Sequence, residues 1–232
     1  MKLSIVVPCF NEAKNIPLIL DRFNQAINRP DVEVILVNNG SKDNSEEVFA
    51  ELVPKYAFAK VVKVDVNKGY GFGITSGLRA ATGEFIGYTH ADMQTDPADV
   101  LKALDIIEKE ANLKNTYVKG DRKGRPAMDQ FFTFGMSVFE TIYMGKNLWD
   151  INAQPNIFHR DFFESLDDMP MDFSLDLYFL YKAQLRKMRV IRFDVVFPPR
   201  VHGESSWNTG FASKWKFIKR TLTFSLKLKK QL

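Results

Sequence analysis

Three side chains able to ligate a metal stand at alternate positions, His90, Asp92 and Gln94, after the predicted strand 84–89. Side chains two positions apart on an extended chain point to the same side, so an imidazole, a carboxylate and an amide oxygen can meet at one ion. This set suits Mn²⁺, and suits Mg²⁺ less because Mg²⁺ prefers oxygen ligands. Such an ion would neutralise a diphosphate leaving group. In the alternative interpretation, His90 caps the next helix and Asp92 lies in a solvated turn.

Two further predicted strands also end in polar residues. The segment 3–10 runs into Asn11 and Glu12, and the segment 32–37 runs into the turn 38–43. Ligands of open α/β sheets bind beyond the carboxyl ends of the strands, so these ends predict one site at one edge of a sheet. The glycines of 69–73 do not follow the first strand with the spacing of a dinucleotide-binding turn. The signatures of P-loop nucleotidases, α/β-hydrolases and zincins are also missing from the sequence.

The elements that must position these residues alternate between strand and helix at short spacing, which predicts an α/β fold with a mostly parallel sheet covered by helices. The residues 120–126 read as a basic loop, and 131–143 as an aromatic helical region. Fourteen of the 20 phenylalanines stand at or after position 131. They predict either an aromatic core or an apolar surface that receives a lipid-linked substrate. Further strands are expected at 60–66 and 116–119, and helices at 16–23, 45–52, 73–81 and from Pro97.

The composition is that of an ordinary globular protein, with 45% hydrophobic and 26% charged residues among 232. A single cysteine, Cys9, permits no internal disulfide and predicts a reducing, cytoplasmic compartment. No apolar run is long enough to span a bilayer. Residues 211–232 carry seven of the 32 basic side chains and none of the 28 acidic ones. Because the positive charge is confined to one end and no recognition motif accompanies it, nucleic acid is not an expected partner.

The residues 211–232 are predicted to form a basic amphipathic helix that follows a domain over 1–210. On a helical wheel an apolar stripe runs beside a row of lysines, the pattern of a helix attracted to anionic lipid. The chain would then sit at the inner face of the cell membrane as a peripheral protein. Alternatively, the stripe docks on the protein's own core. The stripe comprises Phe211, Trp215, Ile218, Leu222 and Leu226.

The order of these motifs resembles the family-2 glycosyltransferases of GT-A fold, in the branch of dolichol-phosphate-mannose synthases and cell-envelope polysaccharide enzymes. The segment 5–12 is similar to the family's first strand and nucleotide-contacting turn, and 38–43 stands where the family has Asp-Asp-Gly-Ser-x-Asp. His90 to Gln94 falls on the Asp-x-Asp metal motif. The resemblance implies a nucleotide-sugar site whose contacts are Pro8, Phe10, Glu12, Asn38, Gly40, Ser41, Lys68, Gly69, Ala91 and Asp92.

The second half matches the family in the same order. Gly120-Asp121-Arg122 resembles a Gly-Ser-Arg segment, in which Arg122 would bind an acceptor phosphate or the donor diphosphate. Asp176 stands where many members place the base that deprotonates an acceptor hydroxyl. Residues 200–207 resemble a loop that closes over the donor phosphates through Arg200 and His202. A second arginine, usual in polyprenyl-phosphate mannose synthases, is replaced by Asp129-Gln130, and Arg125 is its possible substitute.

The resemblance implies a metal-dependent hexosyltransferase with Mn²⁺ or Mg²⁺ as cofactor. It would move a sugar with inversion from a nucleoside-diphosphate sugar to a cell-envelope glycan, such as lipopolysaccharide or capsule, or to a lipid-linked acceptor. A polyprenyl-phosphate sugar synthase is the first alternative. The second is a nucleotide-sugar-binding protein without turnover, because His90 and Asn38 both replace aspartates of the family pattern.

Overall fold

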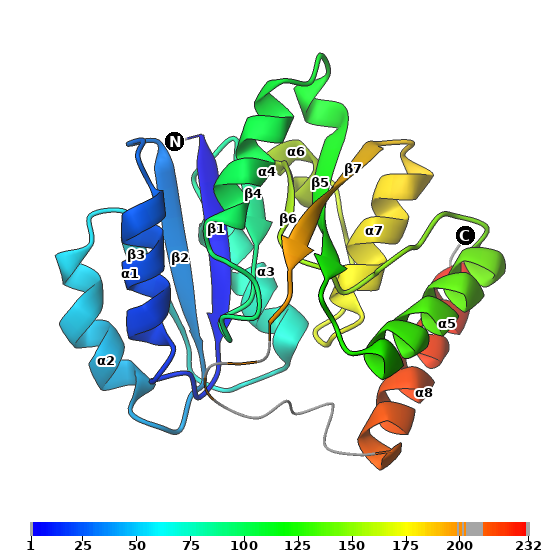
Figure 1. The fold of residues 1–232 in the computed structure, drawn as a ribbon, viewed down its shortest axis with the longest axis horizontal. Coiled ribbons are helices and arrows are strands. Elements are labelled where there is room, and N and C mark those ends of the chain that lie inside the picture. The colour runs from blue at the N-terminus through cyan, green and yellow to red at the C-terminus, as the bar shows by residue number, and fades with distance from the viewer. Residues whose placement is uncertain (1, 199, 201, 203–210, 231–232) are drawn as a thin grey trace.

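A mixed, mostly parallel sheet of seven strands forms the centre of the computed structural model, which describes residues 2–198, 200, 202 and 211–230 (Figure 1). The strand order is β3-β2-β1-β4-β6-β5-β7, and only β6 runs antiparallel to its neighbours. The α/β fold predicted from the alternation of elements is therefore confirmed. The strands are β1 Leu3–Cys9, β2 Val32–Asn39, β3 Ala59–Val64, β4 Phe85–Tyr88, β5 Thr116–Lys123, β6 Asn156–His159 and β7 Arg189–Val196.

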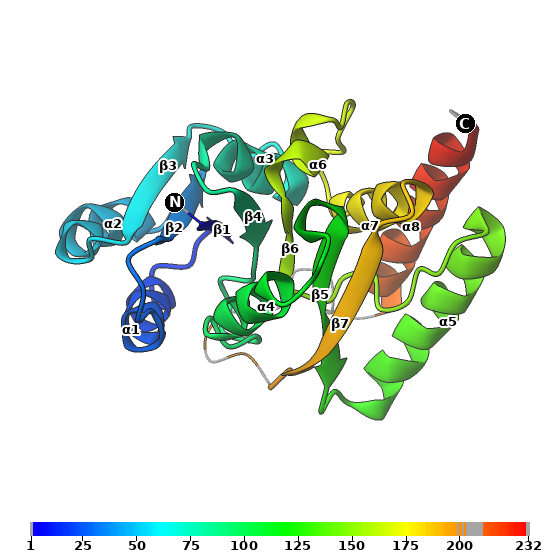
Figure 2. The same cartoon turned by 90° about the horizontal axis from the view of Figure 1, so that it is seen from above.

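Helices cover both faces of this sheet and enclose two hydrophobic cores (Figure 2). Alternate side chains of β1 divide between them, because successive residues of a strand point to opposite faces. Leu3 and Ile5 enter one core, and Val6 enters the other. The first core is closed by α1 Ile16–Ala26, α2 Ser45–Leu52 and α4 Asp99–Glu108, and the second by α3 Tyr70–Ala80, α6 Arg160–Glu164 and α7 Leu175–Leu185. Short 3₁₀ turns span Val53–Lys55 and Leu113–Asn115.

Two long helices, α5 Ala127–Met144 and α8 Phe211–Lys230, lie beside each other past the β7 end of the sheet. The predicted C-terminal helix is thus present. It packs through Thr221, Ser225 and Leu228, which are buried, whereas Trp215 and Leu226 of the predicted apolar stripe are 59% and 50% exposed. Neither helix is long and apolar enough to cross a membrane, and the same holds for every helix in the described ranges.

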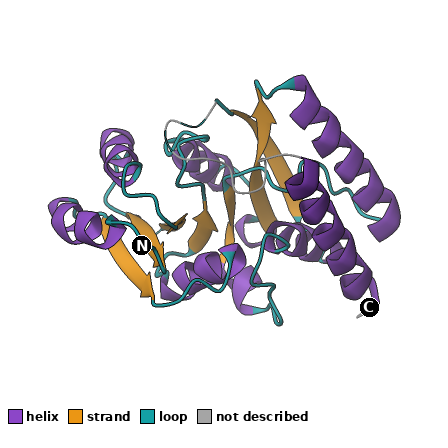
Figure 3. Cartoon of the chain, turned by 90° about the horizontal axis from the view of Figure 1, so that it is seen from below, coloured by secondary structure: helices purple, strands orange, loops and turns teal. Residues whose placement is uncertain are grey.

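The region predicted as a basic loop at 120–126 begins instead as strand. β5 continues to Lys123 because β7 pairs with it in parallel along its whole length, with Arg122 opposite Val195. This correction places Arg122 on a strand near the carboxyl edge of the sheet. Figure 3 views the molecule from the side of that edge.

Candidate functional site

The turns after β1 and β2 are joined by hydrogen bonds into one polar rim. The backbone N–H of Asn11 donates to Ser41 Oγ at 3.1 Å, and Lys42 donates its N–H to Asn11 Oδ1 at 2.8 Å. Asp43 accepts from the backbone N–H of Ala13 at 3.2 Å. The two turns that the sequence predicts to contact a nucleotide are therefore held together.

The two predicted nucleotide-contacting glycines lie at positions where the backbone has a positive φ. Gly40 has a φ of +71°, and a Cβ there would come within 2.5 Å of the backbone nitrogen of Asn67. Gly69 has a φ of +121°, and its carbonyl accepts from Asn39 Nδ2 at 3.1 Å. Left-handed φ values favour glycine, so these residues let the β2 turn and the start of α3 approach closely.

The other predicted nucleotide contacts lie on the same rim with different exposure. Asn38 is 4% exposed, and its Oδ1 accepts from the N–H of Ser41 at 3.1 Å. Phe10 is 41% exposed past the end of β1, and Ala91 is buried. Pro8 is half-buried within β1, while the exposed Lys68 has its ammonium 5.1 Å from the ring centre of Phe72. Their contact with a nucleotide stays a prediction.

His90 has two properties of a metal-binding histidine. Its Nε2 is buried and has no hydrogen-bond partner among the described residues. Burial lowers the pKa of His90 to about 4, so the imidazole is neutral at physiological pH and keeps a free lone pair. The charge of Asp92 acts on this pKa in the opposite direction.

Asp92 and Gln94 complete a donor set that fits a divalent ion. Together with His90 they offer one neutral nitrogen, one carboxylate and one amide oxygen, the combination that suits Mn²⁺. Within the described chain no three His, Cys, Asp or Glu side chains cluster as a metal site, so an ion would depend on the Gln94 amide. Arg200 contacts both of the other ligands: its Nη2 lies 2.8 Å from Asp92 Oδ2, and its Nε donates to Gln94 Oε1 at 3.0 Å.

Glu12 adds a further acidic group to this end of the site. Burial raises its pKa above the ordinary value, and the charges of Asp92 and Asp43 raise it further, whereas Arg200 lowers it. His202 is exposed. The rest of the predicted phosphate loop, 201 and 203–207, lies outside the described residues.

A cavity of about 580 Å³ begins at His90, Asp92 and Arg200 and extends between α5 and α8. Its lining also contains Arg122, Arg125 and Asp176, so the cavity brings together predicted metal, phosphate and base residues from the turn after β4, from β5 and the segment after it, and from α7. The rest of the lining is mostly apolar. The apolar lining includes Phe132, Met136, Ile151, Phe173, Leu177 and Ile218.

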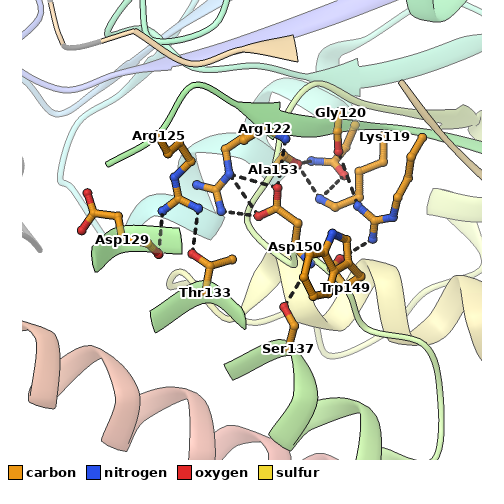
Figure 4. A network of polar contacts seen from close by, with 12 residues as sticks. Lys119, Gly120, Arg122, Arg125, Asp129, Thr133, Ser137, Trp149, Asp150 and Ala153 are labelled. Carbon is orange, nitrogen blue, oxygen red and sulfur yellow. Dashed lines mark hydrogen bonds and ion pairs between the residues drawn. The ribbon is translucent and has the colours of Figure 1, made fainter. Parts of the chain in front are cut away.

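Arg122 is tied into a buried ion pair with Asp150 (Figure 4). Its Nε donates to Asp150 Oδ1 at 3.1 Å, its Nη2 pairs with the same oxygen, and its backbone N–H donates to Oδ2 at 3.1 Å. The two side chains are 6% and 5% exposed. Burial alone would raise the pKa of Asp150, but the Arg122 guanidinium holds it below the ordinary value. Arg122 is therefore neutralised by the protein itself.

Arg125 is also buried, at 8% exposed, but it has no carboxylate within ion-pair distance among the described residues. Its Nη1 donates to Thr133 Oγ1 at 2.7 Å (Figure 4). Burial and the charge of Arg122 lower its pKa to about 10. Both guanidinium groups lie over the ring of Phe197, at 5.3 and 5.8 Å from its centre. A desolvated cation facing a cavity is suited to an anionic ligand.

Asp176 lies at the start of α7 with its carboxylate buried. Tyr88 donates its hydroxyl to Asp176 Oδ1 at 2.7 Å. Burial raises the pKa of Asp176, and the charge of Lys119 opposes that rise. Lys119 is itself fully buried on β5, where burial lowers its pKa to about 7, and it donates to Asn156 Oδ1 at 2.9 Å.

Sequence reasoning missed several residues that shape the site. Asp150 and Phe197, the partners of the two arginines, carry no motif and come from segments distant along the chain. Lys119 could have been found, because a lysine within the predicted strand 116–119 is unusual in a buried position. Tyr88 gave no signal beyond its place at the end of β4.

The profile of Glycosyl transferase family 2 matches residues 4–167. A dolichol-phosphate mannosyltransferase of Pyrococcus furiosus is 26% identical over 211 residues, which are 88% of this chain and 59% of that relative. An undecaprenyl-phosphate 4-deoxy-4-formamido-L-arabinose transferase of Yersinia enterocolitica is 30% identical over 113 residues, 47% of this chain and 34% of the relative. The chain thus spans only part of the length of these curated relatives.

Solved structures share the fold at low sequence identity. Glucosyl-3-phosphoglycerate synthase from Mycobacterium tuberculosis in complex with UDP has a TM-score of 0.75 and is 17% identical, over 97% of this chain and 79% of that one. Another structure of that enzyme contains Mn²⁺, UDP-glucose and glycerol 3-phosphate, with a TM-score of 0.73 at 17% identity, over 97% of this chain and 78% of that one. The fold is therefore the GT-A fold, and with the match over 4–167 the chain belongs to glycosyl transferase family 2.

Proposed function

We propose that this glycosyltransferase moves a sugar from a nucleoside-diphosphate sugar to the phosphate of a polyprenyl-phosphate acceptor. The observation that carries the proposal is Arg125, a buried guanidinium in the lining of a mostly apolar cavity. A lipid phosphate has the matching chemistry, an anion attached to a hydrocarbon chain. The names of the P. furiosus and Y. enterocolitica relatives point to the same acceptor class.

The donor would bind at the rim formed by the β1 and β2 turns, with its diphosphate near His90, Asp92 and Gln94. These three residues would hold a divalent ion, which when bound supplies positive charge to the leaving diphosphate. Arg200 lies within reach of the same position and would share that charge stabilisation. Mn²⁺ together with UDP-glucose in the M. tuberculosis enzyme supports this arrangement of donor and metal.

The acceptor would place its phosphate at Arg125 and its hydrocarbon chain between α5 and α8. An acceptor phosphate oxygen then attacks the anomeric carbon of the sugar, while the bond from that carbon to the diphosphate breaks and the nucleoside diphosphate leaves. The phosphate is already ionised at neutral pH, so no general base is required. Arg125 orients the nucleophile and offsets its charge on approach.

A hydroxyl acceptor is the second candidate, and Asp176 favours it. This carboxylate lines the cavity, and burial raises its pKa, which suits a general base. A glycan or a glycerol-type hydroxyl would then lose its proton to Asp176 during the displacement. The two candidates differ in the residue that turnover requires.

The experiment measures nucleoside diphosphate released from UDP-, GDP- and dTDP-sugars with polyprenyl phosphate, polyprenol or soluble glycan as acceptor. We expect release with polyprenyl phosphate, a loss of about 10-fold or more in Arg125→Gln, and activity retained in Asp176→Asn. Lys123→Gln removes an exposed charge two residues away and is the matched control. Dependence on Asp176 with a hydroxyl acceptor would favour the second candidate. If the protein binds a donor but releases no nucleoside diphosphate with any of the acceptors, it is a nucleotide-sugar-binding protein without turnover.

A membrane-facing surface is part of the same proposal, because a polyprenyl phosphate resides in a bilayer. The outer side of α5 carries exposed apolar side chains, among them Phe131 at 68% and Ile142 at 77% exposure. α8, which lies beside it, carries exposed lysines. Apolar insertion combined with basic charge is how peripheral proteins bind anionic lipid.

A further inference from the structure

Arg200 occupies the ligand atoms that a divalent ion would need. Asp92 Oδ2 lies 2.8 Å from Arg200 Nη2, and Gln94 Oε1 accepts from Arg200 Nε at 3.0 Å. Asp92 Oδ1 is also engaged, because it accepts from the N–H of Gln94 at 3.0 Å. Of the three predicted ligands, only His90 retains an atom without a hydrogen-bond partner among the described residues.

Both polar atoms of the Gln94 amide form hydrogen bonds with residues close to or at Arg200. Gln94 Nε2 donates to the carbonyl of Pro198 at 3.2 Å while its Oε1 accepts from Arg200, so Pro198 and Arg200 both contact this predicted metal ligand. The side chains of Arg200 and Asp92 are 23% and 8% exposed. A charged pair with this little access to water is weakly screened.

We propose that Arg200 is an internal counter-ion that keeps the divalent ion weakly bound until the donor diphosphate draws the guanidinium away. A guanidinium and a divalent cation on the same two oxygens, Asp92 Oδ2 and Gln94 Oε1, would repel each other, so each weakens the binding of the other. A diphosphate offers Arg200 a bidentate anionic partner in place of Asp92. Metal and donor would therefore bind cooperatively. The inference rests on the proposed donor site.

The test measures Mn²⁺ affinity without donor sugar or acceptor, from the electron paramagnetic resonance signal of free Mn²⁺. We expect Arg200→Gln to bind Mn²⁺ alone more tightly than the wild type, by roughly 5- to 150-fold, the usual range of coupling between two sites. Asp92→Asn should weaken Mn²⁺ binding in both backgrounds. Arg79→Gln removes one charge from an exposed position on α3 and should leave the affinity unchanged.

Adding UDP or GDP gives the second arm. In the wild type the nucleotide should tighten Mn²⁺ binding, and in Arg200→Gln this gain should shrink. Equal Mn²⁺ affinity in wild type and Arg200→Gln, or no Mn²⁺ binding by either, overturns the inference. Because the first arm involves no sugar transfer, its outcome is independent of the acceptor. A chain that turns over polyprenyl phosphate but shows no change in Arg200→Gln would contradict only the role of Arg200.

Discussion

Arg122 and Arg125 stand three positions apart, yet their surroundings separate their roles. Arg122 is paired with Asp150 inside the protein, whereas Arg125 has a hydroxyl, Thr133, as its closest polar side-chain partner. The sequence drew attention to Arg122 because Gly120-Asp121-Arg122 resembles the family's Gly-Ser-Arg segment, and to Arg125 only as a possible substitute for a second arginine. It could not reveal Asp150, since an ion pair between residues 28 positions apart depends on the fold.

Removing the Arg122 side chain should therefore mainly lower the stability of the fold, and affect ligand binding less. Arg122→Ala leaves the carboxylate of Asp150 buried without its cation, and loss of one partner of a buried pair typically costs about 3–5 kcal/mol. Urea unfolding measures the effect. The double variant Arg122→Ala, Asp150→Ala should recover part of the loss, whereas a fully additive double variant would contradict the pairing as the cause. Arg125→Ala, without a carboxylate partner, should destabilise much less.

The predicted metal ligands give a second prediction at the residue scale. Asp92→Asn removes the only charged member of the donor set, so Mn²⁺-dependent stabilisation by nucleoside diphosphate should be lost, with turnover reduced by about 100-fold or more. Thermal shift with UDP or GDP, with and without Mn²⁺, measures this loss. Asp105→Asn, on the exposed side of α4, is a matched control. Full metal dependence in Asp92→Asn would exclude this carboxylate from the metal site.

At the scale of elements, local sequence patterns predicted the first four strands. They predicted only part of β5, and they did not predict β6 or β7. β1, β2, β3 and β4 are apolar segments closed by polar turns, and each was predicted within a few residues. β6 is only four residues long, and β7 mixes two arginines and an aspartate with five apolar residues without a regular alternation. The extension of β5 over a basic stretch comes from its pairing with β7, a contact between segments about 70 residues apart.

The contact between α5 and α8 contains a buried acid, Glu140, that should make stability depend on pH. Ser225 Oγ lies 2.8 and 2.7 Å from the two carboxylate oxygens of Glu140 and 3.0 Å from the carbonyl of Thr221. One hydroxyl proton cannot satisfy all three oxygens, so a protonated Glu140 completes the network. Burial raises the pKa of Glu140 to about 7.

The sign of the effect follows from that raised pKa. The folded protein binds the proton more tightly than the unfolded chain, whose glutamate titrates near 4.5, so stability should fall as the pH rises from about 4.5 through 7. Glu140→Gln should remove this dependence and stabilise the protein at pH 8.5, by on the order of 1–2 kcal/mol. Melting temperatures at pH 5.5 and 8.5 test it. Glu47→Gln, on an exposed turn of α2, should change neither value. If the melting temperature changes equally between pH 5.5 and 8.5 in Glu140→Gln and in the wild type, the prediction is wrong.

At the scale of the whole molecule, the phenylalanines of the second half divide between the core and the exposed surface of α5. Phe158, Phe162 and Phe179 build the core around α6 and α7, while Phe131 and Phe134 are exposed on α5. Composition could not separate these groups, because both stand on apolar-rich segments and differ only in what the fold places against them. For the same reason the predicted α8 stripe did not match its docking face, which is set by contact with α5.

The exposed side of α5 yields the last prediction. If it contacts a bilayer, replacing Phe131 and Ile142 by aspartate should weaken binding to vesicles with 30% anionic lipid by about 10-fold or more, since each buried apolar side chain contributes about 1.5–3 kcal/mol. High salt should weaken binding further through the lysines of α8, by up to about 1 kcal/mol each. Val66→Asp is the control, because Val66 is 66% exposed two residues after β3, the strand at the edge of the sheet opposite β7, whereas α5 and α8 lie past β7 (Figure 1). Vesicle flotation unaffected by the α5 changes would mean that the lipid acceptor, if used, reaches the cavity without this surface entering the membrane.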